Sequence, residues 1–361
     1  MSPTRSLRTG VAIVAVIAFC AQVGVASART IVVKPHHSIQ AAIDKAKRGD
    51  TVVVKRGTYR EALVIQTDRV TLKGRNAVLK PPANAPDTPC SKIDPSGVTG
   101  ICVIGDVTPN NGGAPIVNKT VNGVTIFGIT VKGFTGNGIL GFATENLTVS
   151  HTRLLRNGSY GVFSNTSSRT RYLNNVSSGN HAPGLYIGDS PQAHAWVIGN
   201  RSINNLGEGL LARDADFGTV RDNVFAGNCA GILVLADAPG PATDWTVSHN
   251  KVRNNNNACP GEPSEGEPPL SGIGIALLGA ANTSVTNNSV TGNSKGNNPS
   301  LASGGILVMT LPGGPTAPSN DTIKNNHLSG NSPFDLFWDM TGTATFKGNH
   351  CTTSSPSGLC K

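Results

Sequence analysis

The chain has 361 residues, of which 30 are Lys or Arg and 21 are Asp or Glu, so its formal net charge is +9. Beyond residue 28, no segment is long and apolar enough to span a bilayer, which excludes a bundle of membrane-spanning helices. A basic surface favours anionic partners such as acidic polysaccharide, cell-wall polymer or nucleic acid, although a merely soluble basic protein has the same composition.

The first 28 residues have the order of a cleavable secretion signal. Arg5 and Arg8 precede an apolar run that begins at Val11, and Ala26-Ser27-Ala28 supplies small residues at a cleavage point. A membrane anchor is the alternative, but Gln22 interrupts the apolar stretch. We therefore expect residues 1–28 to be removed and residues 29–361 to form one secreted domain of charge +7, with no membrane contact.

Six cysteines remain after residue 28, an even number that favours disulfides in an exported chain. Their positions favour three local bonds among the pairings that six cysteines allow: Cys90–Cys102, Cys229–Cys259 and Cys351–Cys360. No Cys or His spacing suggests a zinc site.

Asn residues recur in pairs that are five positions apart between residues 150 and 350. The pairs are Asn175 with Asn180, Asn200 with Asn205, Asn223 with Asn228, Asn250 with Asn255, Asn288 with Asn293, and Asn326 with Asn331. Asn and Gly both accept the left-handed αL backbone conformation. We expect each Asn to mark a bend with αL angles and to form hydrogen-bonded columns from coil to coil.

Apolar residues alternate with polar ones ahead of each first Asn. A Gly-aliphatic dipeptide such as Gly184-Leu185 follows five of the six second Asn residues, and Asp335-Leu336 takes its place after the sixth. This period-2 alternation predicts short strands with one buried face. The pattern predicts an all-β protein, a parallel β-helix with coils of about 23 residues, and the usual crossover preference makes it right-handed. A leucine-rich repeat is the main alternative, but it would place Leu inside and a single Asn in each repeat.

Both ends of such a stack need a cap, because an open coil exposes core and unpaired strand edges. Ser38 and the apolar stripe of Ile39, Ala42 and Ile43 predict a short capping helix. We expect an N-terminal cap over residues 29–50, stacked coils over 51–350 and a C-terminal cap over 351–361.

The N-terminal region also carries a family resemblance. Ser38-Ile39-Gln40-Ala41-Ala42-Ile43, Gly49-Asp50-Thr51-Val52-Val53-Val54 and Gly57-Thr58-Tyr59-Arg60-Glu61 resemble the opening of pectin-lyase-like right-handed β-helix proteins. The resemblance implies that fold over the whole mature chain. Because the superfamily contains lyases, hydrolases, epimerases and non-enzymatic surface proteins, it transfers no catalytic residue.

A candidate centre lies beyond the Gly-aliphatic strands. Asp189 and Asp214 occupy equivalent positions on successive coils, which places their backbones about 5 Å apart. Arg213 and Asp237 are nearby. Two carboxylates this close suit acid/base catalysis, and we take all four residues as the candidate catalytic set. They also suit a calcium ion held by Asp189 and Asp214. Solvated turn aspartates are the alternative, and the catalytic signatures of alginate epimerases and polygalacturonases are missing.

Candidate binding residues lie on the outside of the same coils. Phe163 and Tyr186 fall in one outward column, where rings stack either on sugars or on each other. Four arginines on two adjacent coils are candidates for binding an anionic polymer: Arg153, Arg156, Arg169 and Arg171. Insertions at 236–244, 256–272, 294–303 and 310–320 either wall an apolar groove or fold over its floor.

Two functional interpretations remain open. The chain is either a lyase or hydrolase of acidic polysaccharide, or a non-catalytic exported protein that binds glycan or cell wall. Export argues against nucleic acid as a partner, and we expect a monomer. A copper-delivery role would need clusters of Met and His, and the mature chain holds only Met309 and Met340 as Met.

Overall fold

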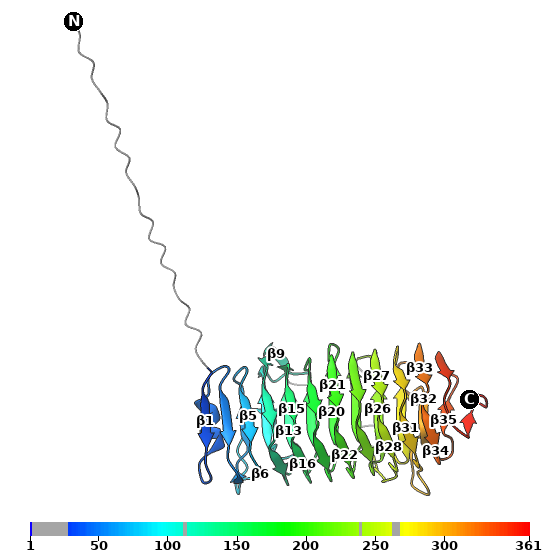
Figure 1. Cartoon of the computed structure of the whole chain (residues 1–361), viewed down its shortest axis with the longest axis horizontal. Coiled ribbons are helices and arrows are strands. Elements are labelled where there is room, and N and C mark those ends of the chain that lie inside the picture. The colour runs from blue at the N-terminus through cyan, green and yellow to red at the C-terminus, as the bar shows by residue number, and fades with distance from the viewer. Residues whose placement is uncertain (2–27, 111–113, 238–239, 262–267) are drawn as a thin grey trace.

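The computed structural model describes residues 1, 28–110, 114–237, 240–261 and 268–361. The described strands form three long parallel sheets, and the coils stack in chain order from the N-terminal to the C-terminal end (Figure 1). The predicted parallel β-helix is therefore confirmed, and three sheets are incompatible with a leucine-rich repeat. The predicted signal peptide falls almost wholly outside the described residues.

Sheet A consists of β1 (Thr30–Val33), β2 (Thr51–Val54), β5 (Thr71–Gly74), β11 (Thr125–Phe127), β15 (Thr148–Ser150), β18 (Arg171–Leu173), β21 (Ala195–Ile198), β24 (Gly218–Arg221), β27 (Trp245–Ser248), β30 (Ser284–Thr286), β33 (Asp321–Lys324) and β36 (Ala344–Lys347). Sheet B consists of β3 (Gly57–Arg60), β6 (Ala77–Lys80), β12 (Thr130–Lys132), β16 (Arg153–Leu155), β19 (Val176–Ser178), β22 (Arg201–Ile203), β25 (Val224–Ala226), β28 (Lys251–Arg253), β31 (Ser289–Thr291) and β34 (His327–Ser329).

Sheet C consists of β4 (Leu63–Ile65), β7 (Ile101–Ile104), β13 (Ile139–Phe142), β17 (Val162–Asn165), β20 (Leu185–Ser190), β23 (Leu210–Ala215), β26 (Ala230–Leu235), β29 (Ile273–Leu278), β32 (Gly304–Met309), β35 (Leu336–Trp338) and β37 (Ser354–Ser355). Two small sheets pair β10 (Val121–Asn122) with β14 (Thr144–Glu145), and β8 (Asp106–Thr108) with β9 (Ile116–Lys119). A 3-10 turn spans Pro89–Lys92.

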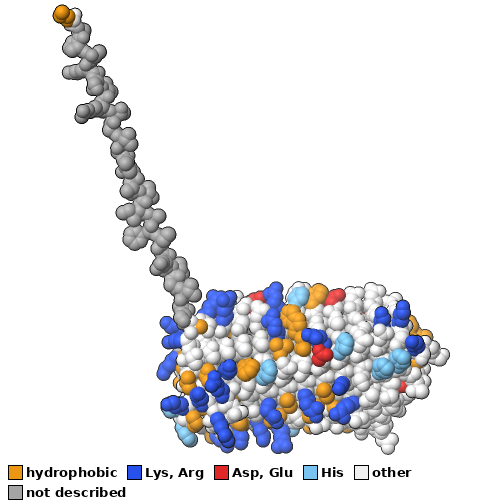
Figure 2. All heavy atoms as spheres, viewed as in Figure 1, with side chains coloured by type: hydrophobic (Ala, Val, Ile, Leu, Met, Phe, Trp, Pro, Cys, Tyr) orange, Lys and Arg blue, Asp and Glu red, His pale blue; other side chains and the backbone are white. Residues whose placement is uncertain are grey.

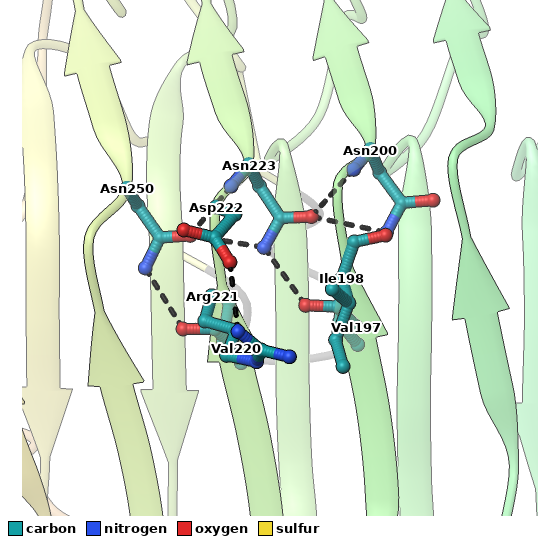
Figure 3. Close-up of polar contacts among 8 residues, drawn as sticks. All are labelled: Val197, Ile198, Asn200, Val220, Arg221, Asp222, Asn223 and Asn250. Carbon is teal, nitrogen blue, oxygen red and sulfur yellow. Dashed lines mark hydrogen bonds and ion pairs between the residues drawn. The ribbon is translucent and has the colours of Figure 1, made fainter.

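The Asn columns form the predicted ladders along two bends of the coil. Asn200 donates from its backbone N–H to Asn223 Oδ1 at 2.8 Å, and its side-chain amide donates to the same oxygen at 3.0 Å (Figure 3). The αL assignment of the ladder residues is wrong by one position. Positive φ belongs to the preceding residue, such as Gly199 at 69° and Asp222 at 59°. That residue makes the bend, so the next side chain points inward to the ladder.

The interior is filled by stacked aliphatic side chains with both ends covered. The helix α1 (Ile39–Asp44) begins at Ser38, whose side chain accepts a hydrogen bond from Ala41 N, and it buries Ile39, Ala42 and Ile43. At the other end, β37 adds to sheet C beside the Cys351–Cys360 disulfide. Within the described part of the chain, no helix combines the length and hydropathy needed to cross a membrane.

All three predicted disulfides are present, with S–S distances of 1.98 Å for Cys90–Cys102, 2.23 Å for Cys229–Cys259 and 2.06 Å for Cys351–Cys360. The first two lie in apolar clusters on the outside of sheet C.

The apolar floor of the predicted groove is covered. Leu233, Ala276 and Leu307 are at most 3% exposed, because Leu270 and Leu301 from the insertions pack against them. The insertions therefore fold over the sheet instead of forming the walls of an open groove.

Candidate ligand-binding surfaces

The predicted acidic centre lies at the bend where sheet C passes to sheet A. Asp189 and Asp214 have φ values of 45° and 47°, and they are in register because Ser190 pairs with Ala215. Their carboxylates have different partners. Asn165 Nδ2 donates to Asp189 Oδ2 at 2.5 Å, whereas the Asp237 backbone N–H donates to Asp214 Oδ1 at 3.0 Å.

Arg213 binds the carboxylate of Asp237, the third aspartate of the predicted centre. Its Nε lies 3.1 Å from Asp237 Oδ1 and its Nη2 lies 3.0 Å from Asp237 Oδ2, a bidentate arrangement. Burial of the Asp214 carboxyl, reinforced by the neighbouring Asp237 carboxylate, raises the pKa of Asp214 to about 7. Asp214 therefore has the proton affinity of a group that exchanges protons near neutral pH.

Access limits what this cluster can do. Asp214 is 1% exposed, so a substrate on the surface does not reach its carboxyl in this conformation. Calcium takes six to eight oxygen ligands, whereas the described residues contain no group of three or more His, Cys, Asp or Glu that could hold a metal ion. The Asp189 and Asp214 carboxylates are held by separate partners, and the calcium ion expected between them stays a prediction.

The two predicted aromatic residues stack on each other. The ring centroids of Phe163 and Tyr186 lie 4.5 Å apart with an interplanar angle of 5°, and Tyr160 contacts both rings. Tyr186 is 3% exposed, and burial raises the pKa of its hydroxyl. These contacts stabilise neighbouring coils, and they leave only Phe163 and Tyr160 partly open to solvent.

The four predicted arginines do not form one patch. Arg153 lies on β16 in sheet B and Arg156 at the bend that follows it. Arg169, two residues before β18 of sheet A, forms an ion pair with Glu145 at 2.5 Å. The Arg171 guanidinium lies 4.7 Å from the centre of the Trp196 ring, on the outside of sheet A. The structure therefore separates the set into two pairs on different sheets.

A larger basic surface covers sheet B. Its ten strands contain seven Lys or Arg and no Asp or Glu: Arg60, Lys80, Lys132, Arg153, Arg201, Lys251 and Arg253. Figure 2 shows Lys and Arg side chains gathered along the lower part of this face, over β6, β16, β22 and β28. The ion pairs found among the described residues involve other side chains.

The sequence carries a signal for this surface that was not recognised from residue spacing. A basic residue directly follows the first ladder position in three coils, as in Thr152-Arg153, Asn200-Arg201 and Asn250-Lys251. In the structure these three cations fall in one column of sheet B, separated by Val176 and Val224.

Two family models match parts of the chain. One is described as "Periplasmic copper-binding protein (NosD)" and covers residues 99–266, and the other as "Right handed beta helix region" and covers residues 191–360. No curated protein sequence matches the chain. Among the described residues, no group of three or more His, Cys, Asp or Glu is placed to hold a metal ion.

Solved structures share the fold at low sequence identity. The A-module of the mannuronan C-5 epimerase AlgE6 from Azotobacter vinelandii is 18% identical, with a TM-score of 0.61 over 88% of this chain and 92% of that one. The Dettilon tailspike protein is 14% identical, with a TM-score of 0.58 over 91% and 60%. The family 28 exopolygalacturonase of Yersinia enterocolitica is 15% identical, with a TM-score of 0.52 over 91% and 77%. Together with the family models, they show that the chain has the right-handed parallel β-helix fold.

Proposed function

We propose that this protein is exported and binds an acidic polysaccharide along the outer face of sheet B. The observation that carries the proposal is that the ten strands of sheet B hold seven cations and no carboxylate. Like charges gathered on one face repel one another, and a polyanion relieves that repulsion. The predicted signal peptide and the three disulfides favour an oxidising compartment outside the cytoplasm.

The spacing of these cations favours a repeating polymer over a small anion. Arg153, Arg201 and Lys251 occupy the same register position on alternate coils, which places their backbones about 10 Å apart along the stack. A uronate polymer repeats its carboxylates at regular intervals, so a straight cation row can contact several of them. The tailspike, epimerase and polygalacturonase matches are compatible with a polysaccharide but share only the fold.

The test is binding of polygalacturonate, alginate and heparin to the triple variant Arg153→Gln/Arg201→Gln/Lys251→Gln. We expect at least a tenfold rise in the dissociation constant for the best ligand, or about 1.4 kcal/mol. The matched control, Lys73→Gln/Lys324→Gln/Lys347→Gln, removes the same charge from outward positions of sheet A. Equal losses in both variants would show that only net charge matters.

A second candidate function is cleavage of that polymer at the bend between sheets C and A, in a conformation that exposes the Asp214 carboxyl buried in this structure. It is favoured by one observation, the pKa of about 7 of Asp214 beside the Asp237–Arg213 pair. Release of unsaturated uronates or reducing ends, lost in Asp214→Asn, would support it. If wild type releases neither product from ligands that it binds, the protein is a binding protein.

A further inference from the structure

We infer that a hollow on the outside of sheet A binds a single uncharged sugar ring. The hollow has a volume of about 200 Å³ and lies where the bend from sheet C enters β21, β24 and the start of β27. Its walls are His194, Trp196, Phe217, Thr219, Asp244 and Thr246. None of these residues belongs to the cation row of sheet B or to the acidic cluster.

The shape follows from side-chain size in one outward column. Trp196, Thr219 and Thr246 are neighbours on three successive coils, so a large ring is followed by two small side chains. Arg171 covers the Trp196 ring from the preceding coil, with its guanidinium carbon 4.7 Å from the ring centre. The ring face toward Thr219 borders the hollow, and two coil spacings of about 5 Å leave room for one sugar ring between Trp196 and Thr246.

Phe217 gives a second, independent observation. It is an exposed aromatic residue with a φ of 60°, a backbone region that bulky side chains rarely adopt. The same bend in other coils holds polar residues with positive φ, such as Asn282 and Asn320. Neither the backbone conformation nor the exposure favours Phe here. Its ring stacks on that of His194, with the centroids 4.8 Å apart and an interplanar angle of 11°. The two stacked rings together form one wall of the hollow. Figure 2 shows hydrophobic, His and acidic side chains together at the upper edge of the middle of the stack.

The polar groups of the hollow suit sugar hydroxyls. Asp244 is exposed, and its Oδ2 accepts a hydrogen bond from the Thr243 hydroxyl at 2.8 Å, which holds the carboxylate in place. Asp244 lines the hollow, where a sugar hydroxyl can donate a hydrogen bond to its carboxylate. The Thr219 and Thr246 hydroxyls add donors and acceptors beside it. Aromatic faces attract the weakly positive C–H groups of a pyranose, whereas Asp244 repels a uronate carboxylate, so the hollow favours an uncharged ring.

The experiment uses the full mature chain and fragments of uncharged β-glucan, mannan and chitin of two to six sugars. Titrations followed by calorimetry and Trp fluorescence in about 0.5 M NaCl screen the cation row of sheet B. We expect at least one fragment to bind with a dissociation constant of about 1 mM. Trp196→Ala, and Thr219→Phe, which fills the hollow, should each weaken that binding about tenfold or more.

The matched control is Thr322→Phe, which introduces the same ring in the same outward column on β33, away from Trp196. It should bind as wild type does, and all variants should keep the wild-type melting temperature within about 2 °C. Failure of every fragment to bind wild type, or unchanged binding to Thr219→Phe, would overturn the inference. Because Thr219→Phe keeps the sheet B cations, loss of polyanion binding in the triple Gln variant tests the proposed function separately.

Discussion

At the scale of single residues, the ladder Asn side chains hold the coils in register. Asn223 donates to the Val197 carbonyl at 2.8 Å and to Asn250 Oδ1 at 2.9 Å, while its own Oδ1 accepts from Asn200 (Figure 3). Asn223 is 1% exposed, so water does not replace a lost partner. Each ladder amide therefore satisfies buried backbone groups of two neighbouring coils, and its removal leaves them without partners.

Replacing Asn223 by Ala should lower the free energy of unfolding by about 2–4 kcal/mol, because several buried hydrogen bonds are lost together. Urea denaturation measures the change. The matched control is Asp222→Asn at the adjacent bend position. This position is exposed, and Asn tolerates its φ of 59°. An Asn223→Ala midpoint equal to that of the control would contradict the role of the ladder.

Asp321 predicts a pH dependence of stability. It is 1% exposed, one carboxyl oxygen accepts from Thr283 N at 2.8 Å, and the other has no partner among the described residues. Burial raises the pKa of Asp321 to about 7, above its unfolded value of 3.8. The folded state therefore binds a proton that the unfolded state releases between these two pH values, and the free energy of unfolding falls as pH rises through this window.

The Asp321→Asn variant stays neutral at every pH, so it should lack this part of the pH dependence. We expect the difference in unfolding free energy, variant minus wild type, to become more positive by about 2–4 kcal/mol between pH 5 and pH 8. Urea titrations of both proteins at the two pH values measure it. A constant difference would mean that Asp321 is already ionised in the folded state at pH 5.

At the scale of elements, the insertions decide which part of sheet C meets solvent. Cys259 and Leu270 exchange backbone hydrogen bonds at 2.8 and 2.9 Å across the insertion after β28. Leu270 packs on the apolar floor, and the Cys229–Cys259 bond fastens the insertion to the start of β26. The insertion is thus held by one disulfide, by apolar contacts and by hydrogen bonds such as that from Asn257 N to the Asn228 carbonyl.

Removing that bond in Cys229→Ser/Cys259→Ser should lower the free energy of unfolding by about 2–4 kcal/mol. It should also speed limited proteolysis within residues 256–272, because the insertion loses its anchor. Cys351→Ser/Cys360→Ser, at the C-terminal end, is the control and should leave cleavage there unchanged. Finding Cys229 linked to any other cysteine by non-reducing peptide mapping would contradict the coil order.

At the scale of the whole molecule, the strands of the three sheets differ in the charged residues that they carry. The strands of sheet B carry cations without a carboxylate, whereas Asp189 and Asp214 lie on sheet C and Asp321 on sheet A. The stack arranges the cations of sheet B in two columns along the molecular axis, so a polymer can contact many coils at once. Binding to such columns releases counterions and depends on salt concentration.

The logarithm of the polyanion dissociation constant should therefore rise linearly with the logarithm of salt concentration. In the Arg153→Gln/Arg201→Gln/Lys251→Gln variant the slope should fall by about 2, since three cation contacts are lost. The sheet A control variant should keep the wild-type slope. A slope that does not change in the sheet B variant would place the polymer on another surface.

The sequence by itself determined the coil, because the features that encode it are local. Asn spacing, alternating Val and Ile, and cysteines close in the chain predicted the ladders, the core and all three disulfides. The αL position was misplaced by one residue, because Asn occurs both at the bend and at the ladder position that follows it. In Asn174-Asn175, the sequence does not show which of the two has the positive φ. Backbone sterics and strand alternation act over a few residues, which a sequence shows directly.

Only the tertiary structure decided which surfaces are open. Successive ladder residues are 23 residues apart between Asn200 and Asn223 but 38 apart between Asn250 and Asn288, so spacing alone does not show how an insertion packs. The burial of Asp214, the cover over Leu233 and the hollow beside Trp196 all depend on contacts between coils and insertions. Such contacts join residues distant in the chain, and their energy comes from side-chain packing that no local pattern encodes.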